Sequence, residues 1–473
     1  MNHLSRIAGL FAAALIGAAA CDACDESAPA GATPASTVTA SGGGGATSTS
    51  TSSAATSTTA AGGSGGAPCE PKGLPSGVPE GWVEYTDWSC DCRFYVPGSK
   101  DVMPAPIQWE ACPSSPGGIA CQVMVADWTT NSVPLSLTSE LSFDESGAPL
   151  ITLQRNLGAP SPGFLFVNAE VDGPVRSAVL SRINPNLDVD YQGCGLRVND
   201  ATEGRYVLFA EGDQFNGPYH PHHKGAIGGS VDDLHPTVLK HLDVDEPFAD
   251  NWFVSKNWVF RLDAYFKLHV FPWDMSTDTI AASQATDPEK IDLSQIRAHG
   301  DALFWTTATL TVSGINSWNP ADGARPLVRF IGDATQGAGN LGTDGVDLVW
   351  SQGSGKAPSD TTYPVRDIMT APFTTDAAEL APKRLRSDPF FGISIAEFQV
   401  GCGYAAHGKG DTLVIVRLSD GVSWILPTDA DFAPIGGPIG LTCDEVFVTG
   451  DIGGRVNVAR IKLDSLGPGA PPD

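Results

Sequence analysis

The sequence repeats one local design over most of its length: two runs of alternating apolar residues joined by a short turn. Asp-Gly or Gly-Gly stands at the tip of three such pairs, at 172–173, 420–421 and 453–454, and a longer turn spans 144–148. These dipeptides permit the positive φ angles that tight hairpin turns require. The chain also holds 53 Gly and 36 Pro, which disfavour long helices. The sequence therefore predicts an all-β protein.

A longer repeat contains these hairpins. Gly-Cys-Gly, a short strand, a glycine-containing turn and a second strand occur from Gln192 and again from Val400. A looser copy begins at Leu441, and Ile119 begins a further partial copy. All-β units that recur roughly every 40–50 residues are typical of a β-propeller, in which each blade buries its faces against its neighbours. We predict a single β-propeller of about seven blades, with six or eight as alternatives and a string of β-sandwich domains as the competing fold.

Seven blade cores can be placed along the chain. They lie near 119–157, 163–211, 224–273, 292–331, 341–373, 395–426 and 437–463. Their near-even spacing favours one propeller over separate sandwich domains. The aromatic-rich segment 69–112 precedes the first core, and we expect it to belong to a blade or to form a disulfide-linked cap. Exposed aromatic rings for ligand stacking are the alternative for this segment.

One segment carries a family resemblance. Residues 344–377 read DGVDLVWSQGSGKAPSDTTYPVRDIMTAPFTTDA: a strand that ends in Val-Trp-Ser, a polar loop, and a second strand, VRDIMTAPF. In this segment the chain resembles TolB-like propeller repeats, closely over one unit and loosely elsewhere. The resemblance implies a propeller fold. It identifies no catalytic residue in this chain, because that family is defined by its blade repeats and not by a set of catalytic side chains.

The N-terminus is expected to be a targeting segment. Ile7–Ala20 is a short apolar run that ends in small residues, which predicts a signal peptide over 1–20. The ending AAAC resembles the lipobox of bacterial lipoproteins, with Cys21 as the lipidated residue. Ala18 stands where that pattern prefers Leu, and plain cleavage after Ala20 is the alternative. Residues 27–67 carry no charge and are nearly all small or polar, so 21–68 is predicted to be a disordered tether and 69–473 the propeller domain.

This organisation predicts a location and a class of partner. A lipidated cysteine followed by a tether suits a domain held off a membrane, so we expect the bacterial cell envelope, at the outer membrane or in the periplasm, with secretion as the alternative. The formal net charge is −26. Such a surface repels nucleic acid and anionic lipid, so we expect no nucleic-acid partner and membrane contact through the lipid anchor only. We also expect a monomer.

Ten cysteines are present, and six of them are candidates for disulfides: Cys90, Cys92, Cys112, Cys121, Cys402 and Cys443. In an oxidising compartment such cysteines form disulfides more readily than metal sites. A single residue separates Cys90 from Cys92, whereas a zinc knuckle has two between its cysteines. We therefore predict disulfides with the pairing open.

Two segments contain side chains suited to metal ions. The stretch GPYHPHHKG (217–225) opens a histidine cluster whose members are His220, His222, His223, His235 and His241. Neutral imidazoles bind zinc or copper, whereas the surrounding Gly and Pro favour a solvent-exposed loop between blades. Asn186, Asp188 and Asp190 alternate in the way that oxygen ligands of calcium can. Tyr191 stands where an EF-hand needs Gly, and alternation in a strand would place these side chains on one solvated face.

A glycine-rich segment at 337–342 resembles a nucleotide-binding motif. GAGNLG at 337–342 matches the dinucleotide-binding fingerprint letter for letter. That fingerprint functions between a strand and a helix, and here a strand follows it. We interpret the segment as a loop between blades.

Three functions are consistent with the sequence. The favoured hypothesis is a binding module that recognises a protein, a peptide or a glycan through loops on one face of the propeller. The alternative is a propeller-type hydrolase or lyase with its site at the central channel, where residues from different blades meet and no motif identifies them. The third hypothesis is metal binding by the His220–His241 cluster, with zinc or copper as the candidate ion, and calcium is the candidate ion for Asn186, Asp188 and Asp190.

Overall fold

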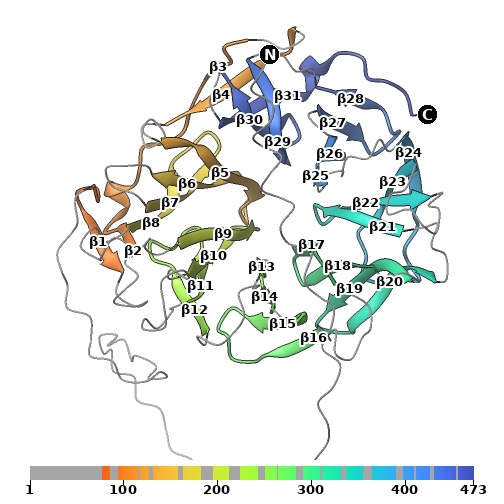
Figure 1. Cartoon of the computed structure of the whole chain (residues 1–473), viewed down its shortest axis with the longest axis horizontal. Coiled ribbons are helices and arrows are strands. Elements are labelled where there is room, and N and C mark those ends of the chain that lie inside the picture. The colour runs from red at the N-terminus through yellow and green to blue at the C-terminus, as the bar shows by residue number, and fades with distance from the viewer. Residues whose placement is uncertain are drawn as a thin grey trace, which may run out of the picture. The chain divides into compact units, whose positions relative to one another are not determined.

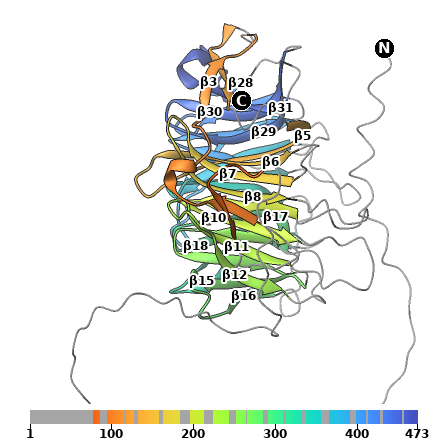
Figure 2. The ribbon, with the colours of Figure 1, turned by 90° about the vertical axis from the view of Figure 1, so that its left-hand side faces the viewer.

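The computed structural model describes residues 77–85, 94–114, 118–126, 132–157, 163–182, 195–211, 224–242, 251–263, 265–283, 291–308, 312–331, 337–354, 365–389, 398–409, 412–426, 431–453 and 456–472. These residues form seven antiparallel sheets arranged in a ring (Figure 1). Viewed from the side, the strands run across the thickness of the ring, so the turns lie on its two faces (Figure 2). The all-β prediction and the prediction of seven blades are confirmed.

Blades 2 to 6 are four-stranded sheets of consecutive strands. Blade 2 contains β9 (Gly195–Thr202), β10 (Arg205–Glu211), β11 (Lys224–Ser230) and β12 (Thr237–Leu242). Blade 3 contains β13 (Asn251–Val254), β14 (Trp258–Leu262), β15 (Lys267–Pro272) and β16 (Thr279–Ser283). Blade 4 contains β17 (Ile291–His299), β18 (Ala302–Ala308), β19 (Val312–Asn319) and β20 (Gly323–Ile331). Blade 5 contains β21 (Gly337–Thr343), β22 (Asp347–Ser354), β23 (Val365–Pro372) and β24 (Lys383–Pro389), and blade 6 contains β25 (Gln399–Gly401), β26 (Tyr404–Lys409), β27 (Thr412–Arg417) and β28 (Ser423–Ile425).

Blades 1 and 7 are larger because N-terminal strands extend them. Blade 1 has the order β1-β2-β8-β7-β6-β5, with β1 (Trp82–Tyr85), β2 (Phe94–Pro97), β5 (Ser132–Phe143), β6 (Pro149–Leu157), β7 (Gly163–Glu170) and β8 (Val175–Arg182). Blade 7 has the order β29-β30-β31-β4-β3, with β3 (Gln108–Ala111), β4 (Cys121–Val125), β29 (Phe432–Leu441), β30 (Glu445–Ile452) and β31 (Val456–Lys462). The N-terminal β4 therefore pairs with the C-terminal β31 and closes the ring. Two 3-10 helices, η1 (Lys100–Val102) and η4 (Leu463–Leu466), complete the named elements.

Seven apolar clusters hold the blades together, one at each interface between neighbours. The second strand of a blade shows how one sequence supplies two of them. In β10, Tyr206 and Leu208 pack toward blade 1, whereas Val207 and Phe209 pack toward blade 3. Successive side chains of a strand point to opposite faces, so a strand that is buried on both faces is apolar at consecutive positions.

No helix within the described ranges is long and apolar enough to cross a membrane.

The predicted hairpin tips are confirmed. The turn at 144–148 joins β5 to β6, the turn around 172–173 joins β7 to β8, and the turn around 420–421 joins β27 to β28. Gly421 and Gly453 adopt φ of 75° and 60°, as the turn chemistry requires. Gly173 adopts no positive φ, because its turn bends differently: its N–H donates to the carbonyl oxygen of Glu170.

The boundaries predicted for the first three blades were wrong. The predicted cores joined β4 to the hairpin of β5 and β6, whereas β4 is the fourth strand of blade 7, and this shifted the next two cores by two strands. The Gly-Cys-Gly repeat was misaligned for a related reason. Gly195 begins β9, the inner strand of blade 2, whereas Cys402 and Gly403 form the turn between β25 and β26. The two copies therefore differ in phase by one strand.

Two further interpretations can be settled. The GAGNLG segment is not a loop but the inner strand β21, which pairs with β22 through a register shift between Gly339 and Gly342. The segment before the first core belongs to blades, since it supplies β1 and β2 of blade 1 and β3 of blade 7. Its described aromatic residues serve the core: Trp82 is 3% exposed, and Phe94 and Tyr95 are fully buried. The TolB-like segment forms β22 and β23, which pair in register from Asp347 to Ser354.

Candidate functional site

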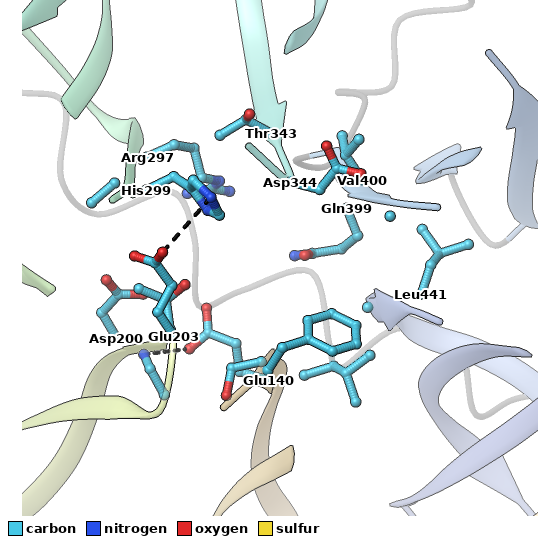
Figure 3. Close-up of a pocket in the computed structure, with 18 of the residues that line it drawn as sticks. Glu140, Asp200, Glu203, Arg297, His299, Thr343, Asp344, Gln399, Val400 and Leu441 are labelled. Carbon is cyan, nitrogen blue, oxygen red and sulfur yellow. Dashed lines mark hydrogen bonds and ion pairs between the residues drawn. The ribbon is translucent and has the colours of Figure 1, made fainter. Parts of the chain in front are cut away.

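A cavity of about 440 Å³ lies where the inner strands of the blades end at the centre of the ring (Figure 3). It is lined by the last residues of six inner strands, β5, β9, β17, β21, β25 and β29, and by Lys256 beyond the end of β13. All seven blades therefore contribute to it. We call this opening the mouth of the channel. Its volume is that of an ordinary small-ligand or side-chain pocket.

The mouth is rich in carboxylates. Its acidic members are Glu140, Asp144, Glu145, Asp200, Glu203 and Asp344, and its basic members are Lys256 and Arg297, with His299 beside them. Converging carboxylates in a partly enclosed space create a negative potential that attracts cations. The mouth thus favours a positively charged ligand over an anionic one.

Several of these carboxylates also join one blade to the next. Oε2 of Glu140 in blade 1 accepts the N–H of Ala201 in blade 2 at 3.1 Å. Oδ2 of Asp200 in blade 2 accepts the N–H of Val254 in blade 3 at 2.7 Å. A carboxylate that accepts a backbone N–H makes a charge-assisted hydrogen bond, which is stronger than a neutral one. Part of the charge at the mouth therefore stabilises the ring itself.

Glu203 makes the most extensive of these connections. Its Oε2 accepts the N–H of Lys256 at 2.9 Å and the N–H of Gly300 at 2.8 Å, so one carboxylate of blade 2 binds blades 3 and 4. Its Oε1 lies 3.7 Å from Nε2 of His299, an ion pair when the imidazole is protonated (Figure 3). His299 in turn packs over Gly345 of blade 5, where a Cβ atom would lie 1.9 Å from Nε2. This network spans four consecutive blades.

Part of the lining of the mouth, which we call its floor, is apolar. Leu141, Leu441 and Phe398 line it and are largely buried, with Phe398 only 1% exposed. Backbone packs closely beside them: a Cβ on Gly401 would lie 2.7 Å from the carbonyl oxygen of Leu441. The ring of Phe398 is buried, whereas Phe143, which also lines the mouth, is only partly buried. The mouth combines carboxylates with this small apolar floor, which suits the charged end and the aliphatic stem of a Lys or Arg side chain.

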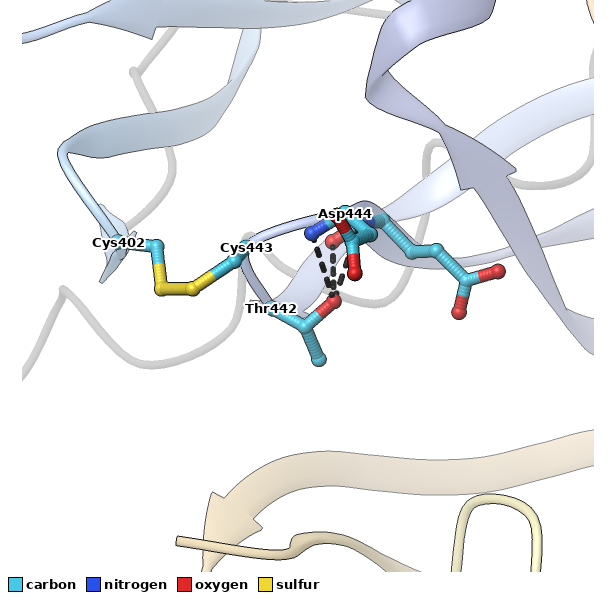
Figure 4. The surroundings of a disulfide bond; sticks show 5 residues. Cys402, Thr442, Cys443 and Asp444 are labelled. Atoms are coloured by element: carbon cyan, nitrogen blue, oxygen red, sulfur yellow. Dashed lines mark hydrogen bonds between the residues drawn. A yellow bond between two sulfur atoms is a disulfide. The ribbon is translucent and has the colours of Figure 1, made fainter.

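A disulfide forms part of the rim. Cys402, in the turn between β25 and β26, is bonded to Cys443, in the turn between β29 and β30 (Figure 4). Cys402 also lines the mouth, and both cysteines are exposed. A second disulfide joins Cys112 to Cys121 across the hairpin of β3 and β4. Four of the six predicted disulfide cysteines are thus confirmed, and Cys90 and Cys92 lie outside the described residues.

Asp144, which lines the mouth, and Asp347, three residues after the mouth-lining Asp344, have pKa values shifted in opposite directions. Burial favours the neutral form of Asp144, but hydrogen bonds from the side chain of Ser146 and from backbone N–H groups outweigh it and lower the pKa of Asp144. Burial and the nearby charge of Asp344 raise the pKa of Asp347. Asp144 is therefore ionised over a wide range of pH, which keeps one side of the mouth negative.

The histidine cluster is only partly within the described residues. His235 is exposed in the turn between β11 and β12, and His241 stands near the end of β12, opposite Gly225. The strand between them separates the two backbones by roughly 20 Å. Outside the described residues lie Cys21, Asn186, Asp188, Asp190, His220, His222 and His223. Among the residues that the structure describes, no group of three or more His, Cys, Asp or Glu side chains is arranged to hold a metal ion.

Comparisons with known proteins concern the fold. No protein-family model and no curated protein sequence matches this chain. An oligogalacturonate lyase in complex with manganese has a TM-score of 0.47 at 11% identity, covering 76% of this chain and 98% of its own. BamB from Moraxella catarrhalis has a TM-score of 0.35 at 11% identity, covering 77% and 95%. A putative TolB from Agrobacterium tumefaciens has a TM-score of 0.30 at 9% identity, covering 61% and 90%. At these values the similarities assign no ligand or activity to this chain.

Proposed function

We propose that this chain is a binding module of the bacterial cell envelope, in which the acidic mouth of a seven-bladed propeller receives a positively charged segment of a protein or peptide. The observation that carries the proposal is the composition of the mouth: six carboxylates and only two permanently charged basic side chains, Lys256 and Arg297, surround one cavity of about 440 Å³. A Lys or Arg side chain can place its stem on the apolar floor and its charge among the carboxylates.

The charge of the mouth favours a basic peptide over an acidic glycan. Six carboxylates line the mouth against two basic side chains, so its potential attracts cations. An acidic glycan would also meet carboxylates of its own sign. A basic peptide segment matches both the charge and the size of the cavity.

The envelope location rests on other features. The apolar N-terminal run, Cys21 and the uncharged tether support export and anchoring through a lipid. The two disulfides, Cys112–Cys121 and Cys402–Cys443, are consistent with an oxidising compartment. We propose anchoring at the outer membrane or in the periplasm, with the propeller facing its partner as a monomer.

Binding of synthetic peptides tests this function. Equal-length peptides rich in Lys, in Ser or in Glu would be titrated by fluorescence anisotropy at low and physiological salt. We expect the Lys peptide alone to bind, and added salt to weaken it. Glu145→Gln, which removes an exposed carboxylate of the mouth, is expected to lower the affinity several-fold.

The matched control is Glu379→Gln. Glu379 is an exposed carboxylate that does not line the mouth and contacts the hydroxyl of Thr374. This variant changes the net charge equally and should bind the Lys peptide as the wild type does. Equal binding of all three peptides, or equal weakening by both variants, would refute the proposal.

One observation favours a second candidate function, an acid–base enzyme. Glu203 is fixed by two backbone N–H groups and directs its other oxygen toward His299 in the same cavity. A carboxylate that orients an imidazole is a common arrangement for a general base in hydrolysis or elimination. The test is turnover of chromogenic peptide and glycoside substrates by the wild type and by His299→Ala. Turnover that His299→Ala abolishes while the Lys peptide still binds would support the enzyme; no turnover by the wild type would exclude it for those substrates.

A further inference from the structure

The Cys402–Cys443 disulfide differs from the other described disulfide in what it connects. Its two cysteines belong to neighbouring blades, with their Cα atoms 4.9 Å apart. Both are exposed, and Cys402, to which Cys443 is bonded (Figure 4), lines the mouth. Cys112–Cys121 joins two strands of one sheet, and Cys121 is only 7% exposed. The rim disulfide is therefore the more accessible to a reductant in solution.

Neither turn at the rim depends on the disulfide for its shape. Cys402 and Gly403 have φ of 49° and 76°, and in blade 2 Glu203 and Gly204 have φ of 49° and 71° in a turn without cysteine. The turn of Cys443 is held by Thr442, whose Oγ1 accepts the N–H of Glu445 at 3.0 Å. The disulfide thus adds a connection between blades 6 and 7 and does not create either turn.

The interface beneath the rim is well packed without it. Ala406 and Ile415 of blade 6 and Val446 and Val448 of blade 7 are fully buried in one apolar cluster. Such packing stabilises the interface independently of the covalent bond. Reduction should consequently leave the two blades together and free only the turns that line the mouth.

We propose that the Cys402–Cys443 disulfide is a redox-sensitive latch that sets the opening of the mouth on the side of blades 6 and 7. The reductant is a dithiol. One of its thiolates attacks an exposed sulfur, forms a mixed disulfide and releases the other cysteine as a thiolate. Its second thiol, as a thiolate, then displaces the remaining cysteine. The dithiol becomes a disulfide, two electrons pass to the protein, and both cysteines end as thiols.

The consequence for ligand binding rests on the proposed function. Gly401, Cys402 and Leu441 line the mouth, so movement of these turns changes the wall that a ligand contacts. The oxidised latch fixes that wall and reduces the ordering cost of binding. We therefore expect the oxidised protein to bind the Lys peptide more tightly than the reduced protein does.

The first test needs no ligand. Free thiols are blocked, dithiothreitol is added in steps, and newly released cysteines are alkylated and located by mass spectrometry. We expect Cys402 and Cys443 to be labelled at lower dithiothreitol than Cys112 and Cys121. Hydrogen exchange should then rise in the turns at 401–404 and 441–445 and stay unchanged in the centres of β27 and β30. Simultaneous reduction of both disulfides, or faster exchange throughout blades 6 and 7, would contradict the latch.

The second test measures the Lys peptide on oxidised and reduced wild type and on the Cys402→Ser/Cys443→Ser pair, with Cys112→Ser/Cys121→Ser as control. We expect a several-fold weaker affinity for the reduced protein and for the first pair only. Equal affinity in both redox states overturns the latch as a regulator. Absence of peptide binding in every state would refute the proposed function, while the alkylation and exchange results would still decide whether the latch exists. If the serine pair does not fold, wild type reduced after folding supplies the comparison.

Discussion

Two sides of the mouth connect neighbouring blades by different chemistry, one by hydrogen bonds and the other by a disulfide. In blade 2, Glu203 stands in the first tight turn and reaches blades 3 and 4 through hydrogen bonds to Lys256 and Gly300. In blade 6, Cys402 stands in the equivalent turn and reaches blade 7 through a disulfide. Both residues have the same left-handed φ of 49°. In these two blades the same position joins a blade to its neighbours, and of the two connections described only the disulfide can respond to a change of redox state.

The largest effect on stability should come from the disulfide side. In the chain-entropy account a longer closed loop gives more stabilisation, and the rim disulfide closes 41 residues against 9 for Cys112–Cys121. We expect Cys402→Ser/Cys443→Ser to lower the free energy of unfolding by about 3–4 kcal/mol and Cys112→Ser/Cys121→Ser by about 1 kcal/mol less. Urea unfolding of both pairs checks this. An equal or larger loss for the short loop would mean that loop closure does not govern the difference.

The hydrogen-bonded side should be weaker. Glu203→Ala removes the acceptor of two backbone N–H groups, and we expect a loss of about 2 kcal/mol. Glu203→Gln keeps a carbonyl oxygen for those groups and should cost less than half as much, because only the charge is lost. Thermal unfolding of both variants, with Glu379→Gln as control, makes the measurement. If alanine and glutamine are equally destabilising, the hydrogen bonds to blades 3 and 4 are not what Glu203 contributes.

A smaller effect concerns the pH dependence of Asp347. Burial and the charge of Asp344 raise the pKa of Asp347 in the folded chain above its value in the unfolded chain. The folded state therefore binds this proton more tightly, so the stability that it contributes is present at low pH and is lost as pH rises through the folded pKa. Asp347→Asn should raise the melting temperature at neutral pH and have little effect near pH 3. The exposed Asp101→Asn serves as control, and a lower melting temperature for Asp347→Asn at neutral pH would contradict the assignment.

The smallest effect on the ring is expected from the histidine cluster. His220, His222 and His223 fall between β10 and β11, away from both rim connections in the sequence. On the metal hypothesis, zinc or copper binds the propeller domain, and the triple change to Ala abolishes the binding without altering unfolding. Calorimetry with His235→Ala as the matched control checks this. Identical titrations of the wild type and the triple variant would end the metal hypothesis.

The sequence predicted the class of fold because its signals are local. A turn dipeptide such as Asp420-Gly421 indicates a hairpin by itself, and a run of consecutive apolar residues, as in β10, indicates a strand buried on both faces. The phase of the blades could not be predicted from the same signals. β4 pairs with β31, which lies more than three hundred residues further along the chain, and nothing near Cys121 indicates that partner.

The mouth was beyond sequence reasoning for a similar reason. Its carboxylates stand at the ends of separate inner strands. Glu140 of blade 1 and Asp344 of blade 5, for example, are separated in the sequence by three whole blades. No spacing motif links residues that meet only when a ring closes. One local pattern could have identified residues of the mouth. In the first turn of a blade an acidic residue or a cysteine precedes a glycine, as at Glu203 and Cys402. Recognition of that pattern requires the correct blade phase.

The most direct test of the acidic mouth is a hydrogen-exchange footprint of the bound Lys peptide on the full folded domain. If the peptide binds in the mouth, exchange should become slower in the turns that follow β5, β9, β17 and β25, next to the mouth-lining residues. Exchange should not change at the opposite ends of the same strands. Protection confined to those opposite ends, with the mouth unaffected, would contradict the claim that the mouth is the binding site.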